Sequence, residues 1–264
     1  MPFSVKAALK PVRDALVEYL NHFSDPVHRH WYFKEVPRLQ KFKDKHKGES
    51  CFIIGNGPSL NRMDLSLLKN HHTFGLNKIY LMFDKVDLDI NYHVSVNSLV
   101  IQQSTKEFES LTCPSFLSVR ASHNIVCSKQ NIYKIMTGVP MSFQEDISKT
   151  VCEGYTVTYV AMQIAFYMGF RNIFLIGVDH NFAVKGKPNE QQFLKQDDPN
   201  HFSPDYFKGS QWNLPDLEAS ELSYRLAKFY FERDDRLIYD ATLDGKLKVF
   251  PKISYEAALE KCKL

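Results

Sequence analysis

The chain has few cysteines, no long apolar run and almost no net charge, and each shortage excludes a class of protein. Its five cysteines are widely spaced without a Cys-x-x-Cys pair, so neither a disulfide framework nor a zinc site is indicated. No stretch approaches the roughly 20 apolar residues of a membrane span, and the N-terminus lacks a signal peptide's apolar run. A net charge of +3 in 264 residues does not suggest nucleic-acid binding. We expect a cytoplasmic protein, and leave peripheral contact with the inner face of the membrane open.

The composition is that of a globular protein with one main domain. Apolar residues make up 44% of the chain, enough for a sizeable core. Residues 1–48 show helical spacing twice, from Val5 to Tyr19 and from Trp31 to Phe42, and are expected to form a helical appendage. A basic run at 41–47 fits a solvated helix end better than a site for anionic lipid or an acidic acceptor. Homo-oligomer contacts through these helices stay open.

A short apolar strand followed by a glycine turn is the most informative stretch of the chain. Residues 52–54 form the strand, and Gly55-Asn56-Gly57-Pro58-Ser59 forms the turn. A strand that ends in such a turn before a helix aims backbone N–H groups and the positive end of a helix dipole at one place. The missing Cβ atoms would let a nucleotide lie against the backbone. The turn is predicted to bind an anionic nucleotide, and an ordinary strand-to-helix loop is the alternative.

Two further strands are expected to end on asparagine, at 73–77 and 92–97. In an open parallel sheet, ligands bind outside the carboxyl ends of the strands. Asn56, Asn77 and Asn97 are therefore expected to converge on one base, ribose or sugar. A turn or cap role is the alternative for each asparagine taken alone.

A buried helix is predicted at 157–168, because nearly every residue there is apolar and Gly169 stands at the C-cap position. Packed on the sheet, this helix would aim its start at the same rim, which makes Thr156 and Thr158 candidate phosphate or ribose contacts. No regular pattern is evident at 120–146.

A central strand at 171–178 leads into Asp179 and His180. Asp179 is a candidate for orienting a sugar hydroxyl or holding a metal, and His180 is a candidate base. A capped strand end with a solvent-facing histidine carries equal weight. The repeated strand, turn and helix order predicts an α/β, Rossmann-like, doubly wound and mostly parallel sheet over residues 49–264.

A long polar loop at about 181–215 is predicted to act as a lid over the site, because loops of this length are usually functional or disordered. His201 and Tyr206 lie among aromatic residues in this loop, a composition typical of a substrate lid. A helix is expected at 217–233, and strands are expected at 236–239 and 246–250, with Thr242 at a polar strand end between them. A short helix is expected at the end of the chain.

These residues resemble the DUF115 or MptE-like superfamily. The resemblance is carried by the strings 53–60 and 169–179 and by the asparagines at 77 and 97, and it covers roughly residues 51–201. That superfamily is similar to bacterial sialyltransferases of glycosyltransferase family 42, to motility-associated nonulosonate transferases and to archaeal hydroxymethylpterin pyrophosphokinases. The resemblance implies a Rossmann-like sheet of a GT-A-like variant.

The transferase branch implies a CMP-activated donor, inversion at the anomeric carbon and a surface-glycan acceptor. The general base of that family is a histidine in a lid, which His201 matches best, with Asp179 and His180 as further catalytic candidates. The charge on the single phosphate of the departing CMP can be stabilised by backbone N–H groups and hydroxyls, so no metal or cofactor is expected. The residues expected to bind the donor are Gly55, Asn56, Gly57, Pro58, Ser59, Asn77, Asn97, Thr156, Thr158, Gly177, Tyr206 and Thr242.

Two other functions stay open. A pyrophosphokinase of the hydroxymethylpterin type would need ATP and Mg²⁺, with carboxylates from Asp179, Asp205 or Asp240. A protein without catalytic activity would hold a nucleotide in the glycine turn as a structural or regulatory ligand.

Overall fold

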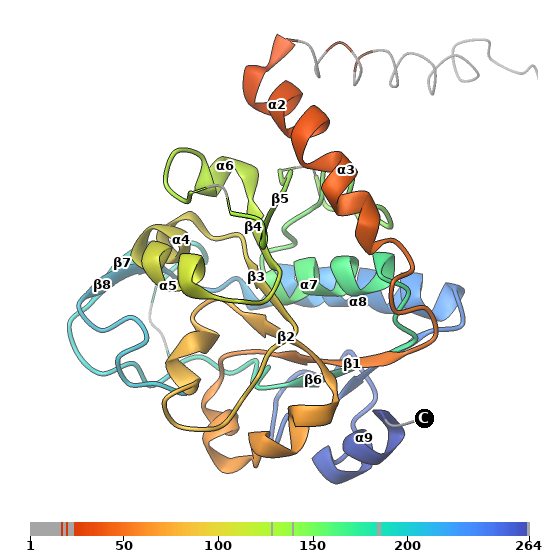
Figure 1. Cartoon of the computed structure of the whole chain (residues 1–264). Coiled ribbons are helices and arrows are strands. Elements are labelled where there is room, and N and C mark those ends of the chain that lie inside the picture. Colours follow the sequence, from red (N-terminus) through yellow and green to blue (C-terminus); the bar gives the residue numbers. More distant parts are fainter. Residues whose placement is uncertain are drawn as a thin grey trace, which may run out of the picture.

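A seven-stranded sheet, wholly parallel, forms the centre of the molecule (Figure 1). The structure, a computed structural model, describes residues 17, 20, 24–127, 129–138, 140–183 and 186–262. The strand order is β5-β4-β3-β2-β1-β6-β9. The strands are β1 Ser50–Ile54, β2 His72–Leu76, β3 Tyr92–Ser95, β4 Ser115–Ser118, β5 Ile132–Ile135, β6 Asn172–Ile176 and β9 Leu237–Asp240. The order reverses between β1 and β6, so the predicted doubly wound, Rossmann-like α/β fold is confirmed.

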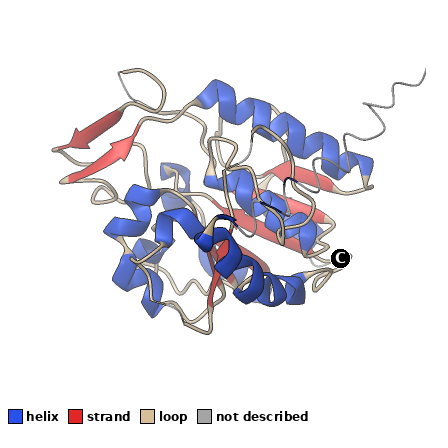
Figure 2. Ribbon diagram, turned by 90° about the horizontal axis from the view of Figure 1, so that it is seen from above, coloured by secondary structure: helices blue, strands red, loops and turns tan. Residues whose placement is uncertain are grey.

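Helices cover both faces of this sheet, as the view from above shows (Figure 2). The α-helices are α2 Pro26–Lys34, α3 Val36–Leu39, α4 Ser98–Gln103, α5 Thr105–Ser110, α6 Val119–Ser122, α7 Val157–Tyr167, α8 Leu217–Arg233 and α9 Tyr255–Cys262. Short 3₁₀ helices are η1 Gln40–Phe42, η2 Pro58–Arg62, η3 Leu65–Asn70 and η4 Ile79–Met82. In the described part of the chain, no helix combines the length and the apolar character that crossing a membrane requires.

Strand β1 divides two hydrophobic cores, because successive side chains of a strand point to opposite faces. Cys51 and Ile53 pack in the core beneath α2, α3, α7 and α8. Phe52 and Ile54 pack in the other core, with residues of η2, η4, α5 and α9. All five residues of β1 are buried, as a central parallel strand requires. The predicted buried helix is confirmed as α7, and Gly169 follows it in the left-handed region at φ 89°.

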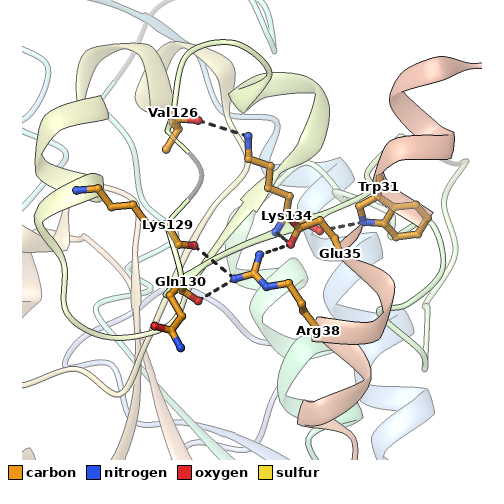
Figure 3. A network of polar contacts seen from close by, with 7 residues as sticks. All are labelled: Trp31, Glu35, Arg38, Val126, Lys129, Gln130 and Lys134. Atoms are coloured by element: carbon orange, nitrogen blue, oxygen red, sulfur yellow. Dashed lines mark hydrogen bonds and ion pairs between the residues drawn. The ribbon is translucent and has the colours of Figure 1, made fainter. Parts of the chain in front are cut away.

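The second predicted N-terminal helix packs on the outer strand of the sheet. Trp31 and Leu39 are buried in the same core as α7. Trp31 Nε1 donates to the carbonyl of Lys134 in β5 at 2.9 Å, and Arg38 donates to the carbonyl of Gln130 at 2.8 Å (Figure 3). The first predicted helix, from Val5 to Tyr19, lies outside the described residues, and the division of the chain at residue 48 stays a prediction.

Three sequence-based expectations were wrong in local structure. Residues 246–250 form no strand; their apolar alternation arises because the buried side chains of Leu247, Val249 and Phe250 join the core containing α7 and α8. Residues 120–146 contain β5. The polar loop at 181–215 contains an antiparallel hairpin of β7 Gln191–Leu194 and β8 Ser210–Asn213. Its strands are partly exposed and glutamine-rich, so no apolar pattern marked them.

Candidate functional site

A cavity of about 990 Å³ opens at the carboxyl ends of the strands, next to the reversal between β1 and β6. Ligands bind at this place in open α/β sheets. Eleven of the predicted site residues line it: Gly55, Asn56, Gly57, Asn77, Asn97, Thr156, Thr158, Gly177, Asp179, His180 and His201. The other four predicted site residues, which the structure also describes, do not line the cavity: Pro58, Ser59, Tyr206 and Thr242.

The glycine turn is bonded to the neighbouring strand end. Ser59 donates to the Asp179 carboxylate twice, from its backbone N–H at 3.1 Å and from its hydroxyl at 2.7 Å. A Cβ at Gly57 would collide with that carboxylate, and one at Gly55 would collide with the Gly177 carbonyl. The glycines are therefore required by the close approach of β1 and β6. The following helix is a five-residue 3₁₀ helix, η2, whose first turn already has Asp179 as its anionic partner.

Asn56 presents an unsatisfied polar group at the cavity. Its backbone carbonyl accepts a hydrogen bond from Phe202 at 2.9 Å. Its side-chain Oδ1 is buried and has no hydrogen-bond partner. A buried acceptor without a partner costs about 1–3 kcal/mol, so a donor from a ligand would relieve that cost.

The other two asparagines also have structural roles. Asn97 is the N-cap of α4, and its Oδ1 accepts from the backbone N–H groups of Leu99 and Val100 at 2.9 and 3.2 Å. Asn77 lies in the left-handed region at φ 47° and accepts from the Ser95 hydroxyl at 3.0 Å. Both still line the cavity, so a ligand would meet side chains whose positions are already fixed.

The start of α7 faces the cavity through a turn of unusual backbone. Gly154 and Tyr155 both have positive φ, 58° and 62°, and Tyr155 is exposed. A tyrosine in the left-handed region costs of order 1–3 kcal/mol, and such strain clusters at functional sites. Thr156 caps α7 by accepting from Thr158 at 3.3 Å, and its hydroxyl lies 3.3 Å from that of Tyr224. The helix start is positive and lines the cavity, which favours an anionic ligand.

His201 is held by a buried carboxylate. Its Nδ1 lies 2.8 Å from Asp198 Oδ2, and the Asp198 side chain has no exposed surface. The imidazole stacks on Tyr206 with ring centroids 4.0 Å apart and an angle of 4° between the planes. Within the described residues no hydrogen bond to Nε2 is recorded, and His201 lines the cavity. A carboxylate on one ring nitrogen and a free second nitrogen are the features of a positioned general base.

The segment that carries His201 is bonded to the strand ends beneath it. Phe202 donates to the glycine turn, and Asn61 donates to the Phe202 carbonyl at 2.8 Å. Lys78 is buried, and its Nζ donates to the Tyr206 carbonyl at 2.7 Å. Burial lowers the pKa of Lys78 to about 8. We call residues 198–207 the histidine segment; in this structure it forms a fixed wall of the cavity.

Tyr206 and Thr242 support the site from behind. Tyr206 is buried, forms the surface on which His201 stacks, and accepts from the Lys78 backbone N–H at 3.3 Å. Thr242 is buried and accepts from the Val178 backbone N–H at 3.2 Å, which fixes the loop after β6.

His180 lies between the cavity and a second, more open hollow of about 580 Å³. Its Nε2 lies 3.2 Å from Glu221 Oε1 of α8, and its backbone has φ 51°. Asp179 is engaged with Ser59, and burial raises its pKa despite those hydrogen bonds. His180 and His201 thus both line the cavity with one ring nitrogen beside a carboxylate, and of the two partners only Asp198 of His201 is completely buried.

Sequence reasoning missed four charged residues at or near the cavity: Arg120, Glu153, Asp198 and Asp216. Asp198 was indistinguishable from the other acids of a polar loop, although its spacing of three from His201 was a usable signal. Arg120 is the only lysine or arginine among the described lining residues. Glu153 also lines the cavity, and burial raises its pKa against an opposing hydrogen bond from Thr137. Arg120 and Glu153 lie in or beside segments without a recognisable pattern.

Two of the three comparisons with known proteins, with family models and with solved structures, found a match. No curated protein matches the chain. A solved structure of the MAf glycosyltransferase from Magnetospirillum magneticum AMB-1 is similar over 86% of this chain, with a TM-score of 0.50 and 12% identity. The chain spans 39% of that protein's length, and at this identity the likeness concerns the fold. The family model described as 6-hydroxymethylpterin diphosphokinase MptE-like matches residues 27–185, more than half of the chain, and the chain therefore belongs to the MptE-like family.

Proposed function

We propose that the chain is a glycosyltransferase that moves a sugar from a CMP-activated donor to a hydroxyl of a glycan acceptor. The sugar is a sialic-acid-like nonulosonate, and the reaction inverts the anomeric centre without a metal. The observation that carries this proposal is the Asp198–His201 pair, whose free imidazole nitrogen lines a cavity at the carboxyl ends of a parallel sheet. The likeness to a MAf glycosyltransferase fold adds support from the architecture.

The chemistry of the pair suits a single displacement. His201 Nε2 takes the proton of the acceptor hydroxyl while the hydroxyl oxygen bonds to the anomeric carbon. The bond from that carbon to the phosphate oxygen breaks, and CMP leaves with the electron pair. Asp198 holds the imidazole in the correct tautomer and stabilises the imidazolium that forms, as the aspartate of a catalytic triad does.

The charge of the cavity favours a ligand with one phosphate. Arg120 and the start of α7 offer positive charge, whereas Glu153, Asp179 and Asp216 bring carboxylates. Asp216 is the N-cap of α8. CMP carries one phosphate, which backbone N–H groups and a single cation can stabilise. A triphosphate would need more cationic partners than the described lining residues provide.

The proposal is tested by measuring CMP release from CMP-activated nonulosonates, with His201→Asn and Asp198→Asn beside the wild type. Turnover in EDTA is expected for the wild type, with a loss of about 10²–10⁴-fold in kcat for His201→Asn. Asp198→Asn should lower kcat and move the acidic limb of the pH profile while leaving KM for the donor similar. A purely structural role for Asp198 would change stability and leave that limb unchanged. No turnover with any CMP donor would overturn the proposal.

A second candidate function, an ATP- and Mg²⁺-dependent diphosphokinase, is favoured by the description of the matching family model. Its expected carboxylates are scattered. Asp240 is fully buried in an ion pair with Lys252, Asp205 is exposed beside Lys208, and Asp179 is engaged with Ser59. Only Asp179 of these three lines the cavity. Calorimetry with ATP and CMP, each with and without Mg²⁺, separates the two functions: tight ATP binding that requires Mg²⁺ would favour the diphosphokinase.

The third reading, a nucleotide-binding protein without activity, predicts CMP or ATP binding without turnover. With wild type and His201→Asn alike, it predicts no turnover with any donor.

A further inference from the structure

Three side chains that commonly bind metals meet at the amino ends of the strands, and the cavity lies at the opposite edge of the sheet, where the strands end. Glu49 directly precedes β1, His72 opens β2, and His46 lies in the turn before Glu49. One ligand atom from each lies within 4.8 Å of the others. His46 Nδ1 is 2.8 Å and His72 Nε2 is 2.6 Å from the same oxygen, Glu49 Oε2.

Two imidazole nitrogens and the carboxylate oxygen that both of them contact are close enough together to coordinate one cation. Two histidines and a glutamate are a known zinc ligand set, with solvent in the fourth position. Tetrahedral ligands at about 2.0–2.2 Å from zinc lie about 3.4 Å apart, so the set must open slightly. The Glu49 side chain is 49% exposed and His72 is 37% exposed, which leaves both free to make that adjustment.

The turn that carries His46 is fixed before any ion binds. Asp44, His46 and Gly48 each donate a backbone hydrogen bond to the last residue of α7 or to one of the two residues after it, at 3.0, 2.8 and 3.0 Å. The His46 ring stacks on Phe170 with centroids 4.6 Å apart. Its far nitrogen, Nε2, lies 2.6 Å from the Tyr92 hydroxyl. Such a partner on the far nitrogen orients a ligating histidine and sets its tautomer.

We propose that His46 Nδ1, Glu49 Oε2 and His72 Nε2 bind a zinc ion, with solvent completing the coordination. Each imidazole offers a lone pair by carrying its hydrogen on the other ring nitrogen, and for His46 the Tyr92 oxygen then accepts that hydrogen. The ion would tie the turn before β1 to the start of β2. Because the cavity lies at the other ends of these strands, the ion is independent of the proposed transfer reaction.

The test is calorimetric titration of ZnCl₂ into the full chain carrying Cys127→Ser, since Cys127 is an exposed thiol that could bind zinc by itself. One equivalent is expected, with micromolar or tighter affinity. Zinc at 100 times the dissociation constant should raise Tm by about 5 °C. Co²⁺ in place of zinc should give the intense visible absorption of a tetrahedral site. No binding at about 100 μM zinc would overturn the proposal.

Three further variants in this background locate the ion. Tyr92→Phe, which keeps the ring and removes the hydroxyl, should weaken zinc binding about 10- to 100-fold. His72→Asn should weaken it by more than that, while its Tm without zinc reports whether the fold survives. His201→Asn is the matched control at the cavity and should bind zinc like the Cys127→Ser parent. Unchanged binding in His72→Asn, or loss in His201→Asn, would place the ion elsewhere and contradict the proposal.

Discussion

The glycine turn and the histidine segment reach the cavity from neighbouring positions, and they differ in where their polar groups are directed. The turn is bonded to the end of the neighbouring strand, because Ser59 donates to Asp179 and the two glycines make room for β6. The histidine segment is anchored by Lys78, Asn61 and the turn, yet it leaves one imidazole nitrogen free. The recognisable motif thus supplies the architecture of the site, and a segment without a motif supplies its candidate base.

The largest expected effect is on the histidine segment and on catalysis. His201→Asn should lower kcat about 10²–10⁴-fold in the transferase assay, because the acceptor proton loses its base. Stability should fall much less, since the side-chain N–H of an asparagine can still donate to the Asp198 carboxylate. His123→Asn, an exposed histidine outside the cavity lining, is the matched control. Equal rates for the two variants would show that the free nitrogen has no catalytic role.

The next effect concerns the anchor of the same segment and depends on pH. The pKa of Lys78 is lowered by burial from its ordinary 10.5 to about 8. Between these two pH values Lys78 is protonated in the unfolded chain and largely deprotonated in the folded protein. Its contribution therefore makes the folded state more stable as pH rises from 8 to 10.5. In Lys78→Met that gain should be missing, a difference of roughly 2–3 kcal/mol in urea unfolding between pH 7 and pH 10. If the free energy of unfolding of the two proteins changed with pH in the same way, burial would not lower the pKa of Lys78.

A third prediction tests the closure of the glycine turn. Gly57→Ala should destabilise the fold by about 1–3 kcal/mol, because the new methyl group overlaps the Asp179 carboxylate. Asp179→Ala removes the larger obstacle and leaves the Gly177 carbonyl at 2.9 Å from the new methyl group, so the double variant should be more stable than the sum of the two single losses indicates. Urea unfolding of the four proteins measures this coupling. Strict additivity would mean that the glycine serves the ligand and not the packing of β1 against β6.

The sequence predicted the sheet well because buried parallel strands are apolar on both faces and their turns carry glycine and asparagine. It predicted most cavity residues for the same reason, since strand ends meet at one edge. It could not show that Asp179 turns inward to Ser59, because a contact across 120 residues has no local pattern. Asp198, Arg120 and the β7–β8 hairpin were missed because their surroundings are polar and irregular. The position of the segment that contains Asp198, for example, depends on tertiary contacts such as the Lys78 anchor.

The smallest expected effect concerns the charge of Asp179. Burial raises the pKa of this carboxyl above its ordinary value of 3.8, so the folded state binds more protons than the unfolded chain between the two values. This group therefore makes the fold less stable as pH rises through that window, and the cost persists above it. Asp179→Asn keeps an oxygen for the Ser59 N–H and lacks the charge. We therefore expect the free energy of unfolding of Asp179→Asn, minus that of wild type, to be larger at pH 7 than at pH 3, as measured by urea unfolding. The reverse order would mean that the Ser59 hydrogen bonds outweigh burial, and that the turn is held by a charge that it prefers to keep.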